Sequence, residues 1–321
     1  MRTNVGVPVL LLLLWTARPA AAQLWDWPAA GDAPAGFSRQ LAELDPVRVE
    51  SLATAHAALV KGLDAWGPED AEHAFRAFLA FYRRVVRSHD PSIDTPELVG
   101  FLSKLCDGRA CGYYMVRALE ASTDPAVLQA LAEHQRLLAP ARTLRSAGIE
   151  VVYGEGNLYR AEDGAFLSSL ARRLPAGPFR EFVESYSSES TIFVSDAAIV
   201  VPWPELGQRL ARWETFARTH PNLPETKAVV TPETGRLREF FVCGVSNTPA
   251  YEPPGGALRT IEPRVLEAYE QFVAANPASA TTALLRDVLE HLARTRGVLD
   301  EPLREYIRTA LGSARTNCER R

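Results

Sequence analysis

Residues 67–86 read GPEDAEHAFRAFLAFYRRVV, and this stretch decides the fold class. Proline suits the first position of a helix because its missing N–H would have no partner there. The acidic residues Glu69 and Asp70 suit the positive end of the helix dipole. Apolar residues then recur at three- and four-residue steps: Phe75, Phe78, Tyr82, Val85 and Val86. This one-sided spacing predicts an amphipathic helix.

The same kind of start precedes most of the other apolar-periodic runs. Six further sites carry it: Asp45-Pro46, Thr95-Pro96, Asp124-Pro125, Gly177-Pro178, Glu262-Pro263 and Glu301-Pro302. Gly297 and Gly312 stand where a glycine is favoured just beyond a helix end. The sequence therefore predicts a mainly α protein, in which amphipathic helix pairs form an irregular solenoid-like or orthogonal bundle.

Two stretches depart from helical periodicity. Residues 148–160 place β-branched and aromatic residues around Gly-Glu-Gly-Asn, which predicts a minor β-hairpin. Residues 191–201 also favour extended structure, with a short helix capped at Ser195-Asp196 as the alternative. The Pro/Gly-rich segment 247–256 predicts a loop.

The N-terminus has the order of a secretory signal peptide. Arg2 is followed by an apolar run at 7–15 and by Ala20, Ala21 and Ala22, which form a small-residue cleavage site. The alternative is an uncleaved anchor, but a spanning helix needs about 20 apolar residues. We therefore expect residues 1–22 to be a signal peptide cleaved after Ala22, with no transmembrane segment afterwards. The predicted location is periplasmic or secreted.

We expect the rest of the chain to form an irregular leader at 23–44 and a single helical domain at 45–321. The places where that domain could divide are near residue 145 and at 247–256. The chain without its first 22 residues has 33 basic and 39 acidic residues, a net charge of −6. This balance argues against nucleic acid as a partner. The abundance of Arg, Ala, Leu and Pro over Lys is typical of a GC-rich bacterial genome.

Four cysteines remain after export, and an even number in an oxidising compartment predicts disulfides. We favour Cys106–Cys111, which spans a turn-forming Asp-Gly, and Cys243–Cys318, which would tie the C-terminal tail to the body. The other two connectivities remain open. A redox or zinc site is less favoured, because the chain has no C-x-x-C and no histidine near either pair at zinc spacing.

One local pattern occurs twice. Trp213-Glu214-Thr215-Phe216 is followed by Pro221, and Tyr269-Glu270-Gln271-Phe272 is followed by Pro277. The pattern resembles the helix junction of tetratricopeptide-like helical-repeat proteins of the bacterial envelope. That resemblance implies stacked helix pairs with a concave surface for a protein or peptide. It covers about a quarter of the chain, and the two copies start 56 residues apart instead of the family's period of about 34.

Few residues indicate catalysis or ligand binding. No metal site and no cofactor are expected, because no H-E-x-x-H motif, P-loop or complete dinucleotide loop occurs. Residues 153–164 contain the candidates for ligand binding and catalysis. Tyr153, Asn157 and Tyr159 are candidate ligand-binding residues, and Glu155 and Asp163 are candidate acid/base carboxylates for glycoside hydrolysis. A turn in a hairpin is the simpler explanation of Gly-Glu-Gly-Asn.

Two functional hypotheses follow. The first is a non-catalytic binding or scaffold protein of the bacterial periplasm or cell envelope, with a protein or peptide partner. The second is an envelope hydrolase that acts on glycan or peptide through a carboxylate acid/base.

Overall fold

The computed structural model describes residues 33–88, 93, 95–106, 114–154, 157–189, 193–195, 197–252, 259–313 and 316–319. Helices dominate this part of the chain, and its strands form small antiparallel sheets of two or three strands. The mainly α prediction is confirmed.

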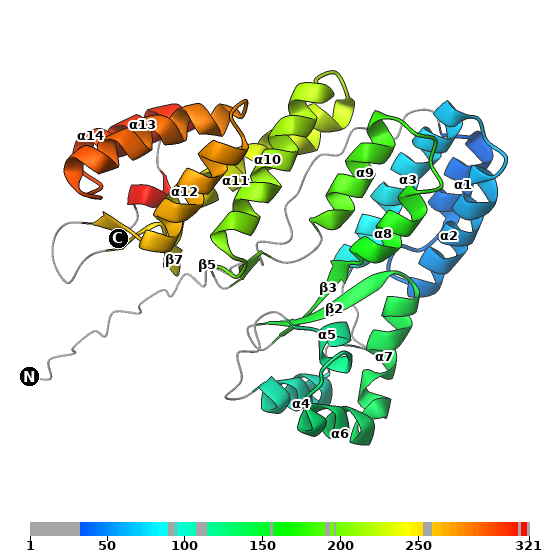
Figure 1. Ribbon diagram of the computed structural model, residues 1–321. Helices are drawn as coiled ribbons and strands as arrows, with labels where there is room; N and C mark the ends of the chain where they lie inside the picture. The colour runs from blue at the N-terminus through cyan, green and yellow to red at the C-terminus, as the bar shows by residue number, and fades with distance from the viewer. Residues whose placement is uncertain are drawn as a thin grey trace, which may run out of the picture.

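Consecutive helices pack against each other in pairs. These are α2(Val49–Leu63) with α3(Pro68–Arg87), α8(Gly164–Ala171) with α9(Pro178–Ser188), α10(Trp203–Thr219) with α11(Thr231–Cys243), and α12(Pro263–Ala275) with α13(Ala280–Thr295). The pairs stand in a row, with α1(Ala35–Glu43) at one end and α14(Glu301–Leu311) at the other (Figure 1). This row, which we call the helix array, is the solenoid-like form of the two predicted arrangements.

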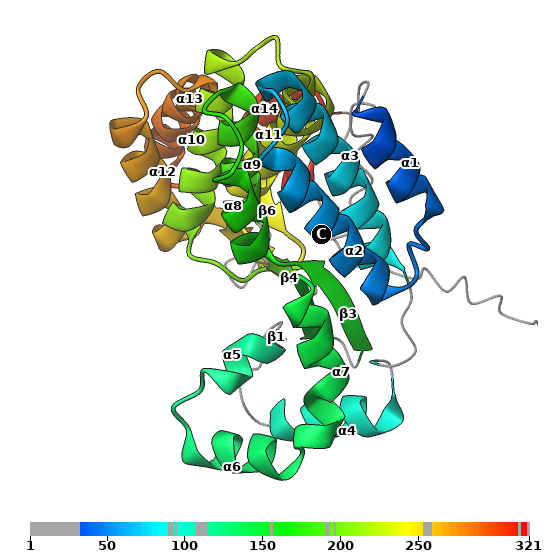
Figure 2. The ribbon, with the colours of Figure 1, turned by 90° about the vertical axis from the view of Figure 1, so that its right-hand side faces the viewer.

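A smaller group of elements is inserted between α3 and α8. It contains α4(Pro96–Cys106), β1(Tyr114–Met115), α5(Val116–Glu120), α6(Pro125–Glu133), α7(Gln135–Ser146), β2(Ile149–Gly154) and β3(Asn157–Glu162). The strands form one sheet in the order β1-β2-β3, and α7 packs against β2. The helices α4 to α7 project to one side of the array (Figure 2). We call this group the inserted module.

Aromatic rings join each helix pair to the next. The ring centroids lie 6.0 Å apart in Phe75–Phe179, 6.0 Å in Phe182–Phe216 and 5.2 Å in Phe241–Phe272. Aromatic pairs in such contacts stabilise the fold by more than the hydrophobic effect of their buried area alone. One cluster of buried hydrophobic residues runs from Phe37 to Cys318, so the array has a continuous core.

Most of the predicted helix starts are confirmed. Proline occupies the first helical position at Pro68, Pro96, Pro125, Pro178 and Pro263, and Glu301-Pro302 begins α14. The start at Asp45-Pro46 is wrong, since α2 begins only at Val49. There the Asp45 carboxylate accepts the Val47 N–H at 2.9 Å. Residues 46 and 47 form a turn, and the helix starts only after Arg48, whose backbone is extended.

The irregular leader expected at 23–44 is wrong for its described part. Residues 35–43 form α1, which buries Phe37 and Leu41. Phe37 packs edge-on against Trp66 at a centroid distance of 5.3 Å. Two apolar residues four positions apart suffice for one helical stripe when a neighbouring helix pair covers them. The predicted signal peptide, residues 1–22, lies outside the described residues.

Both extended predictions are confirmed. The hairpin predicted at 148–160 is β2 and β3, with Glu155-Gly156 outside the described residues. Within 191–201, β4(Val194–Ser195) pairs with β5(Ala198–Ile199). Further short pairs are β6(Gly244–Val245) with β7(Thr248–Pro249), and β8(Tyr251–Glu252) with β9(Thr260–Ile261). Of these strands, β7 and β8 lie within 247–252, the described part of the loop predicted at 247–256.

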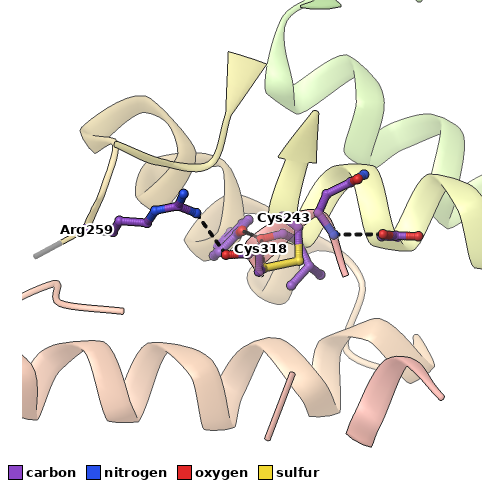
Figure 3. Close-up of a disulfide and its surroundings, with 7 residues drawn as sticks. Cys243, Arg259 and Cys318 are labelled. Carbon is purple, nitrogen blue, oxygen red and sulfur yellow. Dashed lines mark hydrogen bonds between the residues drawn. A yellow bond between two sulfur atoms is a disulfide. The ribbon is translucent and has the colours of Figure 1, made fainter. Parts of the chain in front are cut away.

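The C-terminal tail is held against α11. A disulfide joins Cys243, the last residue of α11, to Cys318 in the short 3₁₀ helix η2(Asn317–Glu319), as predicted (Figure 3). Arg259 donates to the Cys318 carbonyl at 3.0 Å, and the Asn317 N–H donates to Glu239 at 2.9 Å. Of the predicted pair Cys106–Cys111, Cys106 ends α4 and Cys111 lies outside the described residues, so this pairing stays a prediction. Across the described ranges, no helix combines the length and apolar character needed to cross a membrane.

Candidate functional site

The predicted site residues lie where the inserted module joins the helix array. Strands β2 and β3, the start of α8, the C-terminal half of α3 and the helices α5 and α9 meet there. Of the predicted residues, Tyr153, Asn157, Tyr159 and Asp163 are described, whereas Glu155 lies outside the described residues. We call this region the junction.

The three ligand-binding candidates do not share one face of the hairpin. Tyr153 stands opposite Leu158, while Tyr159 stands opposite Val152 and Asn157 stands opposite Gly154. Side chains alternate between the two faces along a strand, and directly opposed residues share a face. Asn157 and Tyr159 are therefore on one face and Tyr153 is on the other. Asn157 is exposed, and both tyrosines are half-buried.

Asp163 has partners on both carboxylate oxygens. Its Oδ1 accepts the N–H groups of Ala165 at 2.8 Å and Phe166 at 3.1 Å, and so caps the N-terminus of α8. Its Oδ2 lies 2.9 Å from Nη2 of Arg117 in α5. The Asp163 side chain thus connects α8 to the inserted module. This residue, predicted as an acid/base, has a structural role here.

A second carboxylate shares the same arginine. Glu150 in β2 is 1 % exposed, and its Oε1 forms an ion pair with the Arg117 Nη2 that also binds Asp163. Buried carboxylates require a cation or several hydrogen bonds, because burial disfavours the charged form. Arg117 therefore neutralises two buried carboxylates at once and holds α5 against the hairpin.

Tyr82 of α3 joins the array to the end of the hairpin. Its hydroxyl donates to the Gly148 carbonyl at 2.6 Å and accepts the Asp163 N–H at 2.8 Å. Gly148 has φ +85°, and a Cβ there would lie 2.5 Å from the Phe166 ring. Only glycine suits both the left-handed backbone and the close ring.

A second polar cluster lies on the α3 side of the hairpin. Glu162, the last residue of β3, accepts Nε of Arg83 at 2.9 Å and the hydroxyl of Tyr186 at 2.5 Å. Arg160 donates to the Val85 carbonyl at 2.8 Å. Three elements, α3, β3 and α9, are therefore bound together through one carboxylate.

The electrostatics of the junction keep the hydroxyls of Tyr82 and Tyr186 protonated. Burial, followed by the nearby Glu162 carboxylate, raises the pKa of Tyr82 well above its ordinary value. The same two causes, in the same order, raise the pKa of Tyr186. Burial, together with repulsion from Arg83, lowers the pKa of the Arg87 guanidinium. Neutral phenols serve here as hydrogen-bond donors.

Apart from Asp163, the junction residues that carry these contacts were not predicted as site residues from the sequence, although one signal pointed to a buried ion pair. Glu150 interrupts the apolar strand Ile149-Glu150-Val151-Val152, and a charged residue within such a run indicates a buried partner. Nothing in the chain order indicates that the partner is Arg117. Within the described ranges, no group of three or more His, Cys, Asp or Glu side chains is arranged to hold a metal ion.

Comparisons with known proteins do not extend this description. The chain has no significant match to a family model, to a curated protein or to a solved structure.

Proposed function

We propose that this protein is an exported, non-catalytic binding or scaffold protein of the bacterial periplasm or cell envelope. The observation that carries the proposal is the row of helix pairs, which offers an extended surface for a protein or peptide partner. The Cys243–Cys318 disulfide supports an oxidising compartment, where such bonds persist.

The contacts of Asp163 argue against a role for this carboxylate as the acid/base of the hydrolase alternative. A general acid or base needs an oxygen that can reach the substrate proton. Both oxygens of Asp163 are already bound, one by the α8 N-terminus and one by Arg117. The junction therefore supports a rigid connection between the module and the array.

Site-directed photo-crosslinking in the producing bacterium tests the binding function. A photoreactive amino acid is placed in turn at exposed positions along the array: Ala53, Gln208, Arg212, Gln271 and Glu290. A binding protein should give discrete adducts at positions that cluster on one face of the row. An absence of adducts at every position, in cells where the protein is exported and folded, would contradict the proposal.

Cell fractionation tests the location separately. The mature chain should be found in the periplasmic or extracellular fraction with an N-terminus at Gln23, and deletion of residues 2–22 should retain it in the cytoplasm. Recovery of the intact precursor in the cytoplasm of wild-type cells would contradict export.

A further inference from the structure

The two copies of the aromatic-Glu-x-Phe pattern end their helices in the same way. The residue that follows α10, His220, has φ −125° and ψ 56°, and the residue that follows α12, Asn276, has φ −127° and ψ 58°. The His220 N–H donates to the Phe216 carbonyl at 2.8 Å, and the Asn276 N–H donates to the Phe272 carbonyl at 2.9 Å. Each motif phenylalanine thus accepts the last hydrogen bond of its helix.

The turns that follow are also alike, with the same offset of 56 residues. Thr226 and Thr282 both return to the end of the preceding helix, since their Oγ1 atoms donate to the carbonyls of His220 at 2.6 Å and Asn276 at 2.5 Å. The same two carbonyls accept the N–H groups of Leu223 and Ser279, at 3.3 Å and 3.0 Å. Both threonines are buried. The two helix junctions therefore share one hydrogen-bonding scheme.

The burial of the two copies agrees as well, with one exception. From 213 to 227 and from 269 to 283, each residue is buried, half-buried or exposed in the same way as its counterpart, except at the motif glutamate. Glu214 is 8 % exposed, whereas Glu270 is exposed. Since the helix ends and the burial of the neighbouring positions match, the difference arises from what covers each glutamate.

Glu214 is covered by the unit that follows it. The Glu214 carboxylate accepts the Ser279 hydroxyl and the Thr281 hydroxyl, the latter at 2.6 Å, at the start of α13. Arg238 of α11 donates to the same carboxylate at 2.6 Å and to Thr281 at 2.8 Å. Ser279 also caps α13 by accepting the N–H groups of Thr281 and Thr282. Glu214 is thus the point on α10 where α13, the second helix of the next pair, docks its first turn.

We propose that α10–α11 and α12–α13 are two copies of one helix-pair unit, and that Glu270 is the docking point of the second copy, left open for the first turn of a helix in a partner protein. This inference rests on the proposed binding function and names the surface. The side chain of Glu270 is exposed. Its counterpart Glu214 shows what such a carboxylate binds in this fold: a hydroxyl cap and a second hydroxyl two residues on, both from the following unit, and an arginine from its own unit.

The chemistry of the partner follows from that precedent. A helix N-terminus presents unpaired N–H groups and a partial positive charge, which favour a carboxylate nearby. A Ser or Thr cap can donate its hydroxyl to Glu270 while it accepts the helix N–H groups, as Ser279 does for Glu214. Arg238 belongs to α11, the same unit as Glu214, so the following unit itself supplies only the two hydroxyls. The outer face of α12 therefore suits a partner helix that begins with Ser or Thr and carries a second hydroxyl two residues on.

The test uses the exported full-length chain in the producing bacterium. A photoreactive amino acid at Ala274, which is exposed and one helical turn from Glu270, reports contacts of this face, because residues four apart on a helix are neighbours. Its counterpart Arg218 donates to the Ala278 carbonyl of the following unit at 3.0 Å. The same photoreactive amino acid at position 212 reports contacts of another part of the array. The 274 probe is combined with Glu270→Lys, and a matched control combines it with Glu290→Lys on α13, whose side chain is 73 % exposed. Mass spectrometry of the adduct then locates the crosslinked residue in the partner.

The proposal expects an adduct at 274 whose partner residue lies in the first turn of a helix that begins with Ser or Thr. Glu270→Lys should lower the adduct yield about tenfold, the effect of losing a charge-assisted hydrogen-bonded contact, and Glu290→Lys should leave the yield unchanged. An adduct at 212 without one at 274 would overturn the docking point and leave the binding function standing. An adduct at 274 that persists in Glu270→Lys would also overturn it. No adduct anywhere would overturn both.

Discussion

The buried ion pair between Arg76 and Glu225 gives the sharpest test of how the array is held together. Nε of Arg76 in α3 lies 2.7 Å from Oε1 of Glu225, which precedes the π-helical turn η1(Thr226–Val230), and the two side chains are 9 % and 0 % exposed. The guanidinium also lies 4.0 Å from the centre of the Phe179 ring in α9. Three layers of the array therefore meet at this pair.

Arg76→Met should lower the free energy of unfolding by about 3–5 kcal/mol at pH 7, because it leaves a fully buried carboxylate without its cation. Methionine retains much of the apolar contact with Phe179, so lost packing contributes less. Glu225→Leu should cost less, since Glu72 lies 3.4 Å from Nη1 of Arg76 and still partners the arginine. The double variant should recover most of the loss, because a buried pair replaced by apolar residues is often neutral.

The measurement is equilibrium unfolding in urea, followed by circular dichroism with the Cys243–Cys318 disulfide intact. Arg294→Met is the matched control, because Arg294 and Glu290 are 65 % and 73 % exposed and such a pair contributes less than about 1 kcal/mol. A loss below about 1 kcal/mol in Arg76→Met, or a double variant no more stable than that single variant, would refute the reasoning.

Three further predictions concern the helix junctions, the disulfide and the join to the inserted module. Thr226→Val and Thr282→Val should each destabilise the protein by a similar amount, about 1 kcal/mol, because each removes the same side-chain hydrogen bond; clearly unequal losses in urea unfolding would argue against two equivalent units. Cys318→Ser should lower stability by roughly 4 kcal/mol by the loop-closure model for a separation of 75 residues, seen as a lower Tm in thermal unfolding. Gly148→Ala should cost about 1–3 kcal/mol, because its φ of +85° and the Phe166 ring 2.5 Å from a Cβ both oppose a side chain. Gly235→Ala, with open space around a helical glycine, should instead stabilise by about 0.5–1 kcal/mol in the same assay.

The helices were predictable because their signals are local. A proline at the first position and a one-sided apolar stripe act within a few turns, and α3, α9 and α12 begin at the predicted residues. Local reasoning failed at Asp45-Pro46, where the Asp45 carboxylate makes a turn with Val47. It also failed at α1, because the apolar stripe of that helix packs against Trp66, which lies between α2 and α3. The junction was only partly predictable, because Asp163 is visible as a polar residue but its partner Arg117 is not.

The sequence by itself determined the helical class, the hairpin at 148–160 and the pairing of Cys243 with Cys318 as the favoured choice, because periodicity, turn residues and cysteine count are properties of the chain order. It also showed the repeated motif. Only the tertiary structure decided what each copy does. Glu214 and Glu270 occupy the same place in the same local pattern, yet one is covered by α13 and Arg238 and the other is exposed. The physical reason is that burial of a side chain depends on which distant segment packs over it, and residues 24 and 67 positions along the chain supply that cover for Glu214.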